Sequence, residues 1–449
     1  MNNRKNLLIG IGGVGMSALA QALLDQGEKV TGVDRMIGTV DKSDLPPSIK
    51  ALSSQGVSIT HDDDSNAVNE IDRIIISTAI EEAHPILVKA RELNIPVVHR
   101  AEALAQALSK HKLLAVAGTC GKSTVTAILC HVLEVCGFDP VVVNGAAIPG
   151  WDFDDTRVGS VRKPSRKLAN ESLRWAVAEV DESDKSLTAF KPEAAVITNA
   201  SADHFGMDET QELFDLFKKN VEGPIDDGRD GEQPQGIELG KWSGSFIENG
   251  IRYTIPQPGI HNIYNAWHAV RIALALGADE ILLQESLATF PGVARRMQKV
   301  GEHITPSGNT VAVIDDYAHN TEKLSAMWQS LGTEFPEGFA AVWRPHGYAP
   351  LRKMLDSLAE MFNSSVREQD ILLILPVYDA GGTANRDINS DSLIARINGF
   401  CKGKVIGVGN LEEAESLLRK VASSVKALVT VGARDPGLPV LARRLVQKI

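Results

Sequence analysis

The chain has 449 residues, of which 43% are hydrophobic, and its formal net charge is −11. This length is enough for two to four domains, and an acidic balance without a basic stripe argues against a general nucleic-acid binder. No apolar run approaches the length of a membrane-spanning helix. The four cysteines contain no C-x-x-C pair, so neither a zinc site nor a disulfide framework is expected. We therefore expect a soluble, cytoplasmic protein without nucleic-acid or membrane partners.

The first 109 residues alternate short apolar runs with helical patterns. Strands are predicted at residues 7–9, 29–34, 74–77 and 95–98, and helices at 16–26 and 101–108. This rhythm is typical of a parallel sheet and predicts a Rossmann-like α/β domain. The polar run at 109–112 marks its boundary with the next module.

A glycine-rich turn at residues 10–15, Gly-Ile-Gly-Gly-Val-Gly, lies between the first predicted strand and helix. It fits G-x-G-x-x-G, which presents a helix N-terminus to a pyrophosphate. Asp34 ends the second predicted strand, where an acidic residue can bind a ribose. This pattern alone does not separate a dinucleotide from a nucleotide sugar.

The second module, residues 110–296, opens with a stretch that resembles a phosphate loop. Residues 116–123 read Val-Ala-Gly-Thr-Cys-Gly-Lys-Ser, between an apolar run and a predicted helix at 124–135. Val116 stands where G-x-x-x-x-G-K-[ST] has its first glycine, and a plain glycine turn is the alternative. The flanking strand and helix favour an ATP site, in which Lys122 would reach the terminal phosphates and Ser123 would ligate Mg²⁺. We expect this loop to be exposed and Lys122 to lie outside the core.

Acidic and histidine residues follow two later strands of this module. Residues 179–184, Glu-Val-Asp-Glu-Ser-Asp, come after the predicted strand 175–178. Mg²⁺ prefers hard oxygen ligands, so Glu179 is the first candidate ligand, and a solvated acidic turn is the alternative. Asp203 and His204 follow the predicted strand 194–198. His204 can ligate a second Mg²⁺ or orient the γ-phosphate, or it can be a surface residue.

The rest of the second module combines a polar stretch with a helix. Residues 221–240 are rich in Gly, Asp, Glu and Gln and predict an exposed loop, and a helix is predicted at 262–276. Asn262 and Asn265 share one face of this helix. Their amides can bind a nucleotide base, although ordinary N-capping by Asn262 is the simpler interpretation. His268 is expected to be a packing residue.

The third module, residues 297–449, repeats the α/β rhythm. Strands are predicted at 311–314, 340–343, 371–375 and 428–431, which indicates a second Rossmann-like sheet. Residues 315–319, Asp-Asp-Tyr-Ala-His, and 343–348, Trp-Arg-Pro-His-Gly-Tyr, follow two of these strands, where α/β proteins bind ligands. Arg296, near the start of the module, can span ATP phosphates.

Taken in order, these motifs resemble the Mur ligase family along nearly the whole chain. The matching segments are 9–17, 77–80, 99–102, 118–123, 179–184, 198–199 with 203–204, 261–266, 315–319 and 345–346. Each is short, but nine motifs in the family's order are highly specific. The fold implied is α/β in three domains: a Rossmann-like UDP-sugar-binding domain, a central phosphate-loop ATP-binding domain and a Rossmann-like C-terminal domain.

The resemblance implies an ATP-dependent amide-forming ligase of peptidoglycan precursor synthesis. ATP would phosphorylate the carboxylate of UDP-N-acetylmuramate to an acyl phosphate, which the amine of an amino acid, or of a short peptide, would attack. A monomer or homodimer is expected. The implied catalytic residues are Lys122, Glu179 and His204, and the implied Mg²⁺ ligands are Ser123, Glu179 and His204. The implied ATP contacts are Gly118, Thr119, Gly121, Lys122, Ser123, Thr124, Asn262, Asn265, Arg296 and Asp316. The implied substrate contacts are Gly12, Gly13, Gly15, Met16, Asp34, Ser77, Tyr317, His319 and His346.

The sequence also departs from the family pattern, and this leaves the acceptor open. Cys120 replaces a histidine that is usual in the branch that adds L-alanine, whereas Ser183 is typical of that branch. Gly347 and Pro350 replace two arginines that help to hold the carboxylate of the incoming amino acid. A ligase for murein peptides is therefore the first alternative, and a non-catalytic nucleotide-binding homologue is the second. An NAD-dependent oxidoreductase leaves the phosphate loop unexplained.

Overall fold

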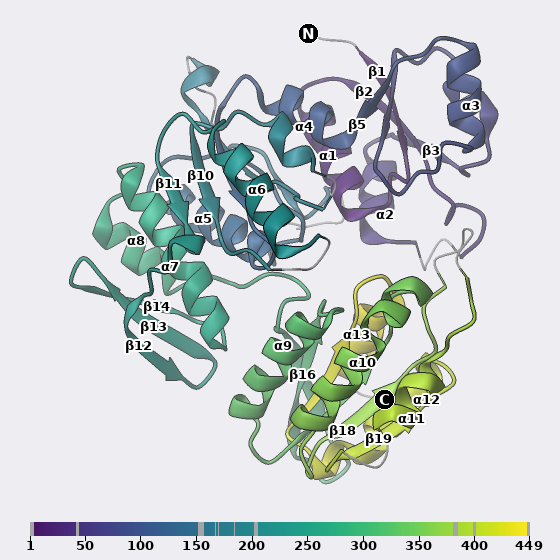
Figure 1. The fold of residues 1–449 in the computed structure, drawn as a ribbon, viewed down its shortest axis with the longest axis vertical. Coiled ribbons are helices and arrows are strands. Elements are labelled where there is room, and N and C mark those ends of the chain that lie inside the picture. Colours follow the sequence, from purple (N-terminus) through teal and green to yellow (C-terminus); the bar gives the residue numbers. More distant parts are fainter. Residues whose placement is uncertain are drawn as a thin grey trace. The chain divides into compact units, whose positions relative to one another are not determined.

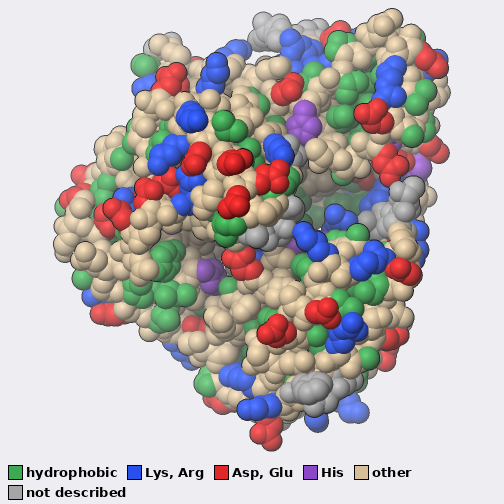
Figure 2. All heavy atoms as spheres, in the orientation of Figure 1, with side chains coloured by type: hydrophobic (Ala, Val, Ile, Leu, Met, Phe, Trp, Pro, Cys, Tyr) green, Lys and Arg blue, Asp and Glu red, His purple; other side chains and the backbone are tan. Residues whose placement is uncertain are grey.

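The computed structural model describes residues 4–41, 45–150, 157–166, 168, 170–183, 185–201, 205–379, 385–397 and 401–446. The chain forms two compact units. The first comprises Met1–Glu238, Ser245–Pro256 and Asn262–Val293, and the second comprises Leu239–Gly244, Gln257–His261 and Ala294–Ile449. In the part of the chain that the structure describes, no helix has the length and apolar character needed to span a bilayer. Acidic and basic side chains are interspersed over the face shown in Figure 2.

The first sheet is parallel, and its strand order is β3-β2-β1-β4-β5. Its strands are β1 (Lys5–Ile9), β2 (Lys29–Val33), β3 (Ser58–Thr60), β4 (Arg73–Ile76) and β5 (Val97–His99), and its helices are α1 (Val14–Asp25), α2 (Pro47–Ser54), α3 (Pro85–Glu92) and α4 (Arg100–Leu108). Leu8 packs with α1 and α4, whereas Leu7 and Ile9 pack with α3. Because β1 is the central strand of this order, the glycine turn that follows it lies at the middle of the sheet's carboxyl edge.

The second sheet has the order β11-β10-β6-β9-β7-β8, and all its pairs are parallel except β7 with β8. Its elements are β6 (Lys112–Ala117), α5 (Lys122–Val135), β7 (Val141–Val143), β8 (Val161–Arg162), β9 (Trp175–Glu179), β10 (Ala194–Ile197), α6 (Met207–Lys218) and β11 (Ile225–Asp227). Since β6 lies between β9 and β10, the phosphate loop, the acidic segment and the segment after β10 meet at one edge. A single apolar cluster joins this sheet to α1 and α4 of the first.

A small sheet of order β12-β13-β14 follows β11 along the chain. Its elements are β12 (Gln235–Gly240), β13 (Ser243–Glu248) and β14 (Ile251–Ile255), followed by α7 (Ile260–Ala275) and α8 (Glu280–Leu287). Phe246 and Tyr253 stack at 5.5 Å and belong to the same core cluster as α5, α7 and α8. Figure 1 shows this small sheet next to α7 and α8. The predicted exposed loop at 221–240 was wrong, because it contains β11 and all of β12. β12 is almost entirely solvent-exposed, and β11 buries two aspartates, so neither shows an apolar alternation.

The sheet of the second unit has the order β15-β16-β20-β17-β18-β19, with only β15 antiparallel. Its strands are β15 (Gln298–Ile304), β16 (Thr310–Asp316), β17 (Phe339–Trp343), β18 (Ile371–Ile374), β19 (Lys404–Gly407) and β20 (Ala427–Val431), and its helices are α9 (Thr321–Glu334), α10 (Tyr348–Ser365), α11 (Ser390–Ile397), α12 (Leu411–Val421) and α13 (Gly437–Val446). Helices α9, α10 and α11 cover one face, and α12 and α13 cover the other (Figure 1).

The predicted α/β class with parallel sheets is confirmed. The three predicted modules, 1–109, 110–296 and 297–449, stay a prediction. Their limits fall between elements: α4 ends at Leu108, β6 begins at Lys112, and β15 begins at Gln298.

Candidate active site

The loop between β6 and α5 is a tight cradle that only glycine can build at two positions. Gly118 has a φ of +124° and Gly121 a φ of +88°, both unfavourable for residues with a side chain. A Cβ at Gly118 would lie 2.0 Å from Oγ1 of Thr198, and one at Gly121 would lie 2.3 Å from Oδ1 of Asn265. Gly121 is also the N-cap of α5 and offers no side chain to its N–H groups. These N–H groups are therefore open to an anion.

The segment after β10 holds this loop in place. The backbone N–H of Cys120 donates to Oδ1 of Asn199 at 3.0 Å. The Cys120 carbonyl accepts from Oγ1 of Thr198 at 2.5 Å and from Nδ2 of Asn199 at 2.9 Å. The sequence interpretation did not give Thr198 and Asn199 a role at the site. Two polar residues directly after a fully buried strand were the signal that could have identified them.

Lys122 is held on both sides rather than exposed. Its Nζ lies 2.6 Å from the carbonyl of Gly118 and 2.6 Å from Oε2 of Glu182. The Lys122 side chain is 12% exposed and that of Glu182 is 4% exposed, so the expected exposure of this lysine was wrong. Burial opposes the charged form of Lys122, but Glu182, Asp181 and Glu179 outweigh it and raise the lysine's pKa. Burial raises the pKa of Glu182, although Lys122 opposes the shift.

Ser123 and Glu179, the predicted Mg²⁺ ligands, both contact the turn after β7. The amide of Asn144 donates to the Ser123 carbonyl at 3.2 Å. The N–H of Gly145 donates to Oε2 of Glu179 at 2.7 Å. Within the described residues the hydroxyl of Ser123 makes no hydrogen bond, although the residue is only 5% exposed. A hydroxyl without a hydrogen bond and a carboxylate held at the same turn are oxygen ligands of the kind that a hard divalent cation takes.

Other predicted metal ligands lie beyond what the structure describes. His204 and Asp203, and also Asp184 of the acidic segment, fall outside the described residues. Among the residues that are described, no three His, Cys, Asp or Glu side chains converge as a metal site. The structure therefore bears on Ser123 and Glu179 alone.

Arg100 links the first glycine turn to the acidic segment. Its Nη2 lies 2.9 Å from Oδ2 of Asp181, and its Nη1 lies 3.0 Å from the position of a Cβ on Gly15. Burial opposes the charged form of Asp181, but Lys122 and Arg100 outweigh it and lower its pKa. The sequence interpretation placed Arg100 in a family motif without a role. Its position at the start of α4 brings it to the N-terminal turn of α1.

The predicted substrate residues of the first sheet have different surroundings. The Asp34 carboxylate accepts from the N–H of Gly12 at 2.9 Å and from the N–H of Met36 at 3.0 Å, so it shapes the glycine turn. Met16 is 4% exposed and packs in the core. Gly13 closes the turn by donating to the Gly10 carbonyl at 3.0 Å, and Ser77, after β4, is half-buried.

Asn262 and Asn265 lie on α7 and are both buried. The Asn265 amide contacts Oδ1 of Asn262 at 3.4 Å and faces Gly121 of the phosphate loop. His268, one turn further along, bonds Asp226 at 2.5 Å and is 3% exposed, as expected for a packing residue. Thr119 and Thr124 are also buried in and after the loop. The structure thus brings Asn265 next to the phosphate loop.

In the second unit, the residues after β16 and β17 lie together. The Asp316 carboxylate accepts from the N–H groups of Met297 and Ala318 at 2.6 and 2.7 Å. The guanidinium of Arg296 lies 5.2 Å from the Tyr317 ring. His319 makes an edge contact with the ring of His346 at 4.9 Å. Three predicted substrate residues, Tyr317, His319 and His346, are therefore neighbours.

Burial controls the ionisation of this group. Burial lowers the pKa of His319 to about 3, and Lys323 adds to the effect. Burial and then Arg296 lower the pKa of His261 to about 4. Burial raises the pKa of Asp316, although Arg296 opposes the shift.

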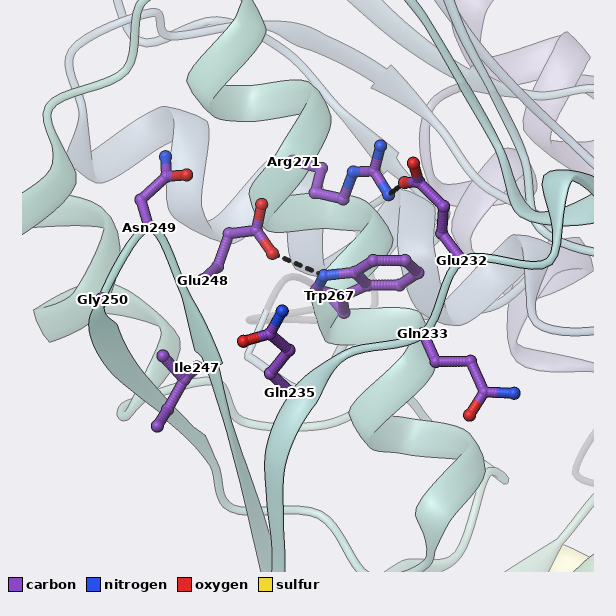
Figure 3. Close-up of a pocket in the computed structure, with 9 residues that line it drawn as sticks. All are labelled: Glu232, Gln233, Gln235, Ile247, Glu248, Asn249, Gly250, Trp267 and Arg271. Atoms are coloured by element: carbon purple, nitrogen blue, oxygen red, sulfur yellow. Dashed lines mark hydrogen bonds and ion pairs between the residues drawn. The ribbon is translucent and has the colours of Figure 1, made fainter.

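A cavity of about 560 Å³ lies between the small sheet and α7, and the residues that line it include no predicted site residue (Figure 3). Nε1 of Trp267 donates to Oε2 of Glu248 at 2.7 Å. Arg271 lies over the Trp267 ring at 4.6 Å and pairs with Glu232. The indole N–H, the guanidinium and the two carboxylates that line the cavity thus already bind one another.

Comparisons with known proteins cover nearly the whole chain. Residues 8–112 match the family model described as "Mur ligase family, catalytic domain", and residues 116–221 match "Mur ligase middle domain". The chain is 30% identical to a UDP-N-acetylmuramate–L-alanine ligase of Sinorhizobium fredii, over 95% of this chain and 93% of the relative. It is 31% identical to the protein of that name from Rhizobium meliloti, with the same coverage.

Solved structures share the fold at lower identity. A UDP-N-acetylmuramate–alanine ligase from Thermotoga maritima has a TM-score of 0.79 at 23% identity and covers 98% of each chain. A murein peptide ligase from Psychrobacter arcticus has a TM-score of 0.69 at 19% identity and covers 99% of each chain.

Proposed function

This chain belongs to the Mur ligase family, and we propose that it is an ATP-dependent ligase that joins an amino acid to UDP-N-acetylmuramate. L-Alanine is the proposed acceptor, and peptidoglycan precursor synthesis the proposed role. One observation carries the proposal: relatives named for this activity align at about 30% identity along 95% of the chain. The carboxylate would take the terminal phosphoryl group of ATP, and the amine would then displace phosphate and lose a proton. One ATP is thus spent for each amide.

The phosphate loop supports the nucleotide half of this reaction. Gly118, Thr119, Gly121 and Thr124 would surround the phosphates with backbone N–H groups. Lys122 would leave Glu182 for phosphate oxygens, and its raised pKa keeps it charged at neutral pH. Mg²⁺ held by Ser123 and Glu179 would neutralise charge on the phosphates, and His204 stays a candidate for the same task.

The remaining contacts are proposed residue by residue. Asn262 and Asn265 of the first unit, and Arg296 and Asp316 of the second, are candidates for ATP contacts. The glycine turn before α1 is the candidate site for the pyrophosphate of the nucleotide sugar. The proposed contacts are Gly12, Gly13, Gly15 and the backbone of Met16. Asp34 would shape the turn, and Ser77 is a further candidate contact. Tyr317, His319 and His346 are candidates for the acceptor.

A coupled ADP-release assay tests the proposal. Wild-type protein with ATP, Mg²⁺ and UDP-N-acetylmuramate is expected to release ADP only when L-alanine is added. Activity with short peptides alone would move the acceptor to the murein-peptide class. No ADP release with any acceptor would favour a non-catalytic homologue.

Lys122→Ala should abolish turnover, whereas Lys89→Ala, at an exposed lysine of α3, should not. Because Lys122→Ala leaves buried Glu182 without its partner, the double variant Lys122→Met with Glu182→Gln separates lost charge from lost stability. If Lys122→Ala keeps near-normal turnover, the role of this lysine is wrong.

Metal requirement, assembly and location complete the proposal. Removal of Mg²⁺ with EDTA should stop turnover, and added Mg²⁺ should restore it. A monomer or homodimer in the cytoplasm is proposed, and light scattering after size-exclusion chromatography measures the mass.

A further inference from the structure

Arg434 lies in the turn between β20 and α13, and its guanidinium lies near Gly347, which has no side chain. Its Nη1 is 3.8 Å from the position that a Cβ would take on Gly347. β17 and β20 are parallel neighbours with Trp343 opposite Val431, so the turns that follow them run side by side. The N–H of Arg344 donates to the Val431 carbonyl at 3.2 Å and joins the starts of the two turns.

No carboxylate among the described residues pairs with the guanidinium of Arg434. The adjacent Asp435 is buried, and its two oxygens bind Arg344 at 2.7 Å and the N–H of Gly437 at 2.8 Å. Within the residues that the structure describes, Arg434 makes no hydrogen bond or ion pair, and it is exposed. An unpaired guanidinium is the side chain best suited to bind a carboxylate through two parallel hydrogen bonds.

The two arginines nearest to Gly347 and Pro350 in the sequence are already paired. Arg344 binds Asp435 and also donates to the Pro376 carbonyl at 3.0 Å. Arg352 pairs with Asp387. Using either one for a ligand would leave a protein carboxylate without its partner, whereas Arg434 can bind a ligand at no such cost.

The neighbours of Arg434 belong to the proposed acceptor site. Gly347 follows His346, whose ring contacts His319, and Nδ1 of His319 in turn donates to the Tyr317 carbonyl at 2.9 Å. These residues follow β16 and β17, at the carboxyl edge of the parallel sheet, where α/β folds bind ligands.

We propose that Arg434 binds the α-carboxylate of the incoming amino acid and makes a free α-carboxylate a requirement for the acceptor. The inference rests on the proposed function, since it assigns a residue within that acceptor site. Its basis is an uncompensated cation, the open space at Gly347 and the adjacent histidines. Amino-acid amides and esters, which lack this charge, should be poor acceptors.

Kinetics with L-alanine and L-alaninamide test the inference. Arg434→Ala is expected to raise the KM for L-alanine roughly 10- to 100-fold, the loss expected for a charge-assisted hydrogen bond. The KM for ATP should stay unchanged, and the preference for L-alanine over its amide should disappear. Arg434→Lys should keep part of that preference, because it keeps the charge but loses the two-point geometry. Arg396→Ala, at an exposed arginine of α11, is the matched control and should behave as wild type.

A transplanted arginine gives a second, independent test. A Cβ on Gly347 meets nothing closer than Cδ of Pro350 at 3.4 Å, so a side chain can be accommodated there. Gly347→Arg in the Arg434→Ala background should restore both the KM for L-alanine and the discrimination against the amide. If wild type ligates L-alanine but Arg434→Ala keeps its KM and its preference, the inference is wrong and the proposed function stands. If wild type releases no ADP with any amino acid, the proposed function itself fails.

Discussion

Replacing Gly121 by alanine tests the fit of the phosphate loop, and Gly137 provides a matched control. The two glycines flank α5 and have almost the same left-handed backbone, with φ values of +88° and +84°. They differ in the space around them. A Cβ on Gly137 meets nothing within 4 Å, whereas one on Gly121 would lie 2.3 Å from Oδ1 of Asn265.

The backbone cost is therefore shared, and the collision is specific to Gly121. An L-residue in this conformation costs about 1–2 kcal/mol, so Gly137→Ala should lower the free energy of unfolding by about that amount. Gly121→Ala has the same cost and must also push the Asn265 amide away, which adds about 1–3 kcal/mol for overpacking. The displaced loop should weaken ATP binding about tenfold or more, equivalent to one lost charge-assisted hydrogen bond.

Urea unfolding measures the stability difference, and calorimetric titration with ATP measures binding. Gly137→Ala should bind ATP as tightly as wild type. Wild-type ATP affinity in both variants would refute the assignment of the nucleotide to this loop. An equal loss of affinity in both would instead show that binding follows global stability.

Three further outcomes follow from the ionisable groups. Glu182→Gln should lower the pKa of Lys122, because burial then acts without the nearest carboxylate that opposes it. Lys122 should therefore lose its charge at a lower pH than in wild type. A titration of the Kd for ATP against pH should show the loss of affinity beginning at a lower pH in the variant. Burial raises the pKa of Asp139, but hydrogen bonds from backbone N–H groups outweigh burial and lower that pKa from 3.8 to about 2. The stabilisation that ionised Asp139 gives should be complete above pH 3.8 and lost as the pH falls through 2. Asp139→Asn should remove this pH dependence from urea unfolding measured in acid. His261 and His319 should stay neutral down to about pH 4, as imidazole NMR spectra would show. Unfolding returns the pKa of both histidines towards 6.5. The free energy of unfolding should therefore fall as the pH drops below 6.5.

Local patterns made several elements predictable from the sequence. The strand, glycine loop and helix around Lys122 follow one another within about 25 residues, and hydropathy and glycine positions are sufficient to place them. The buried strands β10, β17 and β20 were placed within one residue for the same reason. β12 was missed because a strand exposed on both faces has no apolar period to recognise.

Partners distant in sequence could not be predicted from it. Glu182 lies 60 residues beyond Lys122, and the acidic segment offered other carboxylates of the same chemistry. Only the neighbouring positions of β6 and β9 in the sheet bring Glu182, rather than Glu179, to the lysine. Likewise, Glu179 binds Gly145 because β7 is the next strand after β9. The residue types were predictable, whereas their pairing depends on strand order.

Strand order also decides what the missing family arginines mean. Read along the chain, Gly347 and Pro350 remove the cations expected near His346, and the sequence therefore left the acceptor in doubt. In the sheet, β20 is inserted between β16 and β17, so a residue 87 positions after Gly347 lies beside it. A charge lost from one strand end can be replaced from its neighbour without any change in the fold, because both turns face the same edge. Absence of a motif residue in the sequence is therefore weak grounds for denying the chemistry until the adjacent strand ends have been identified.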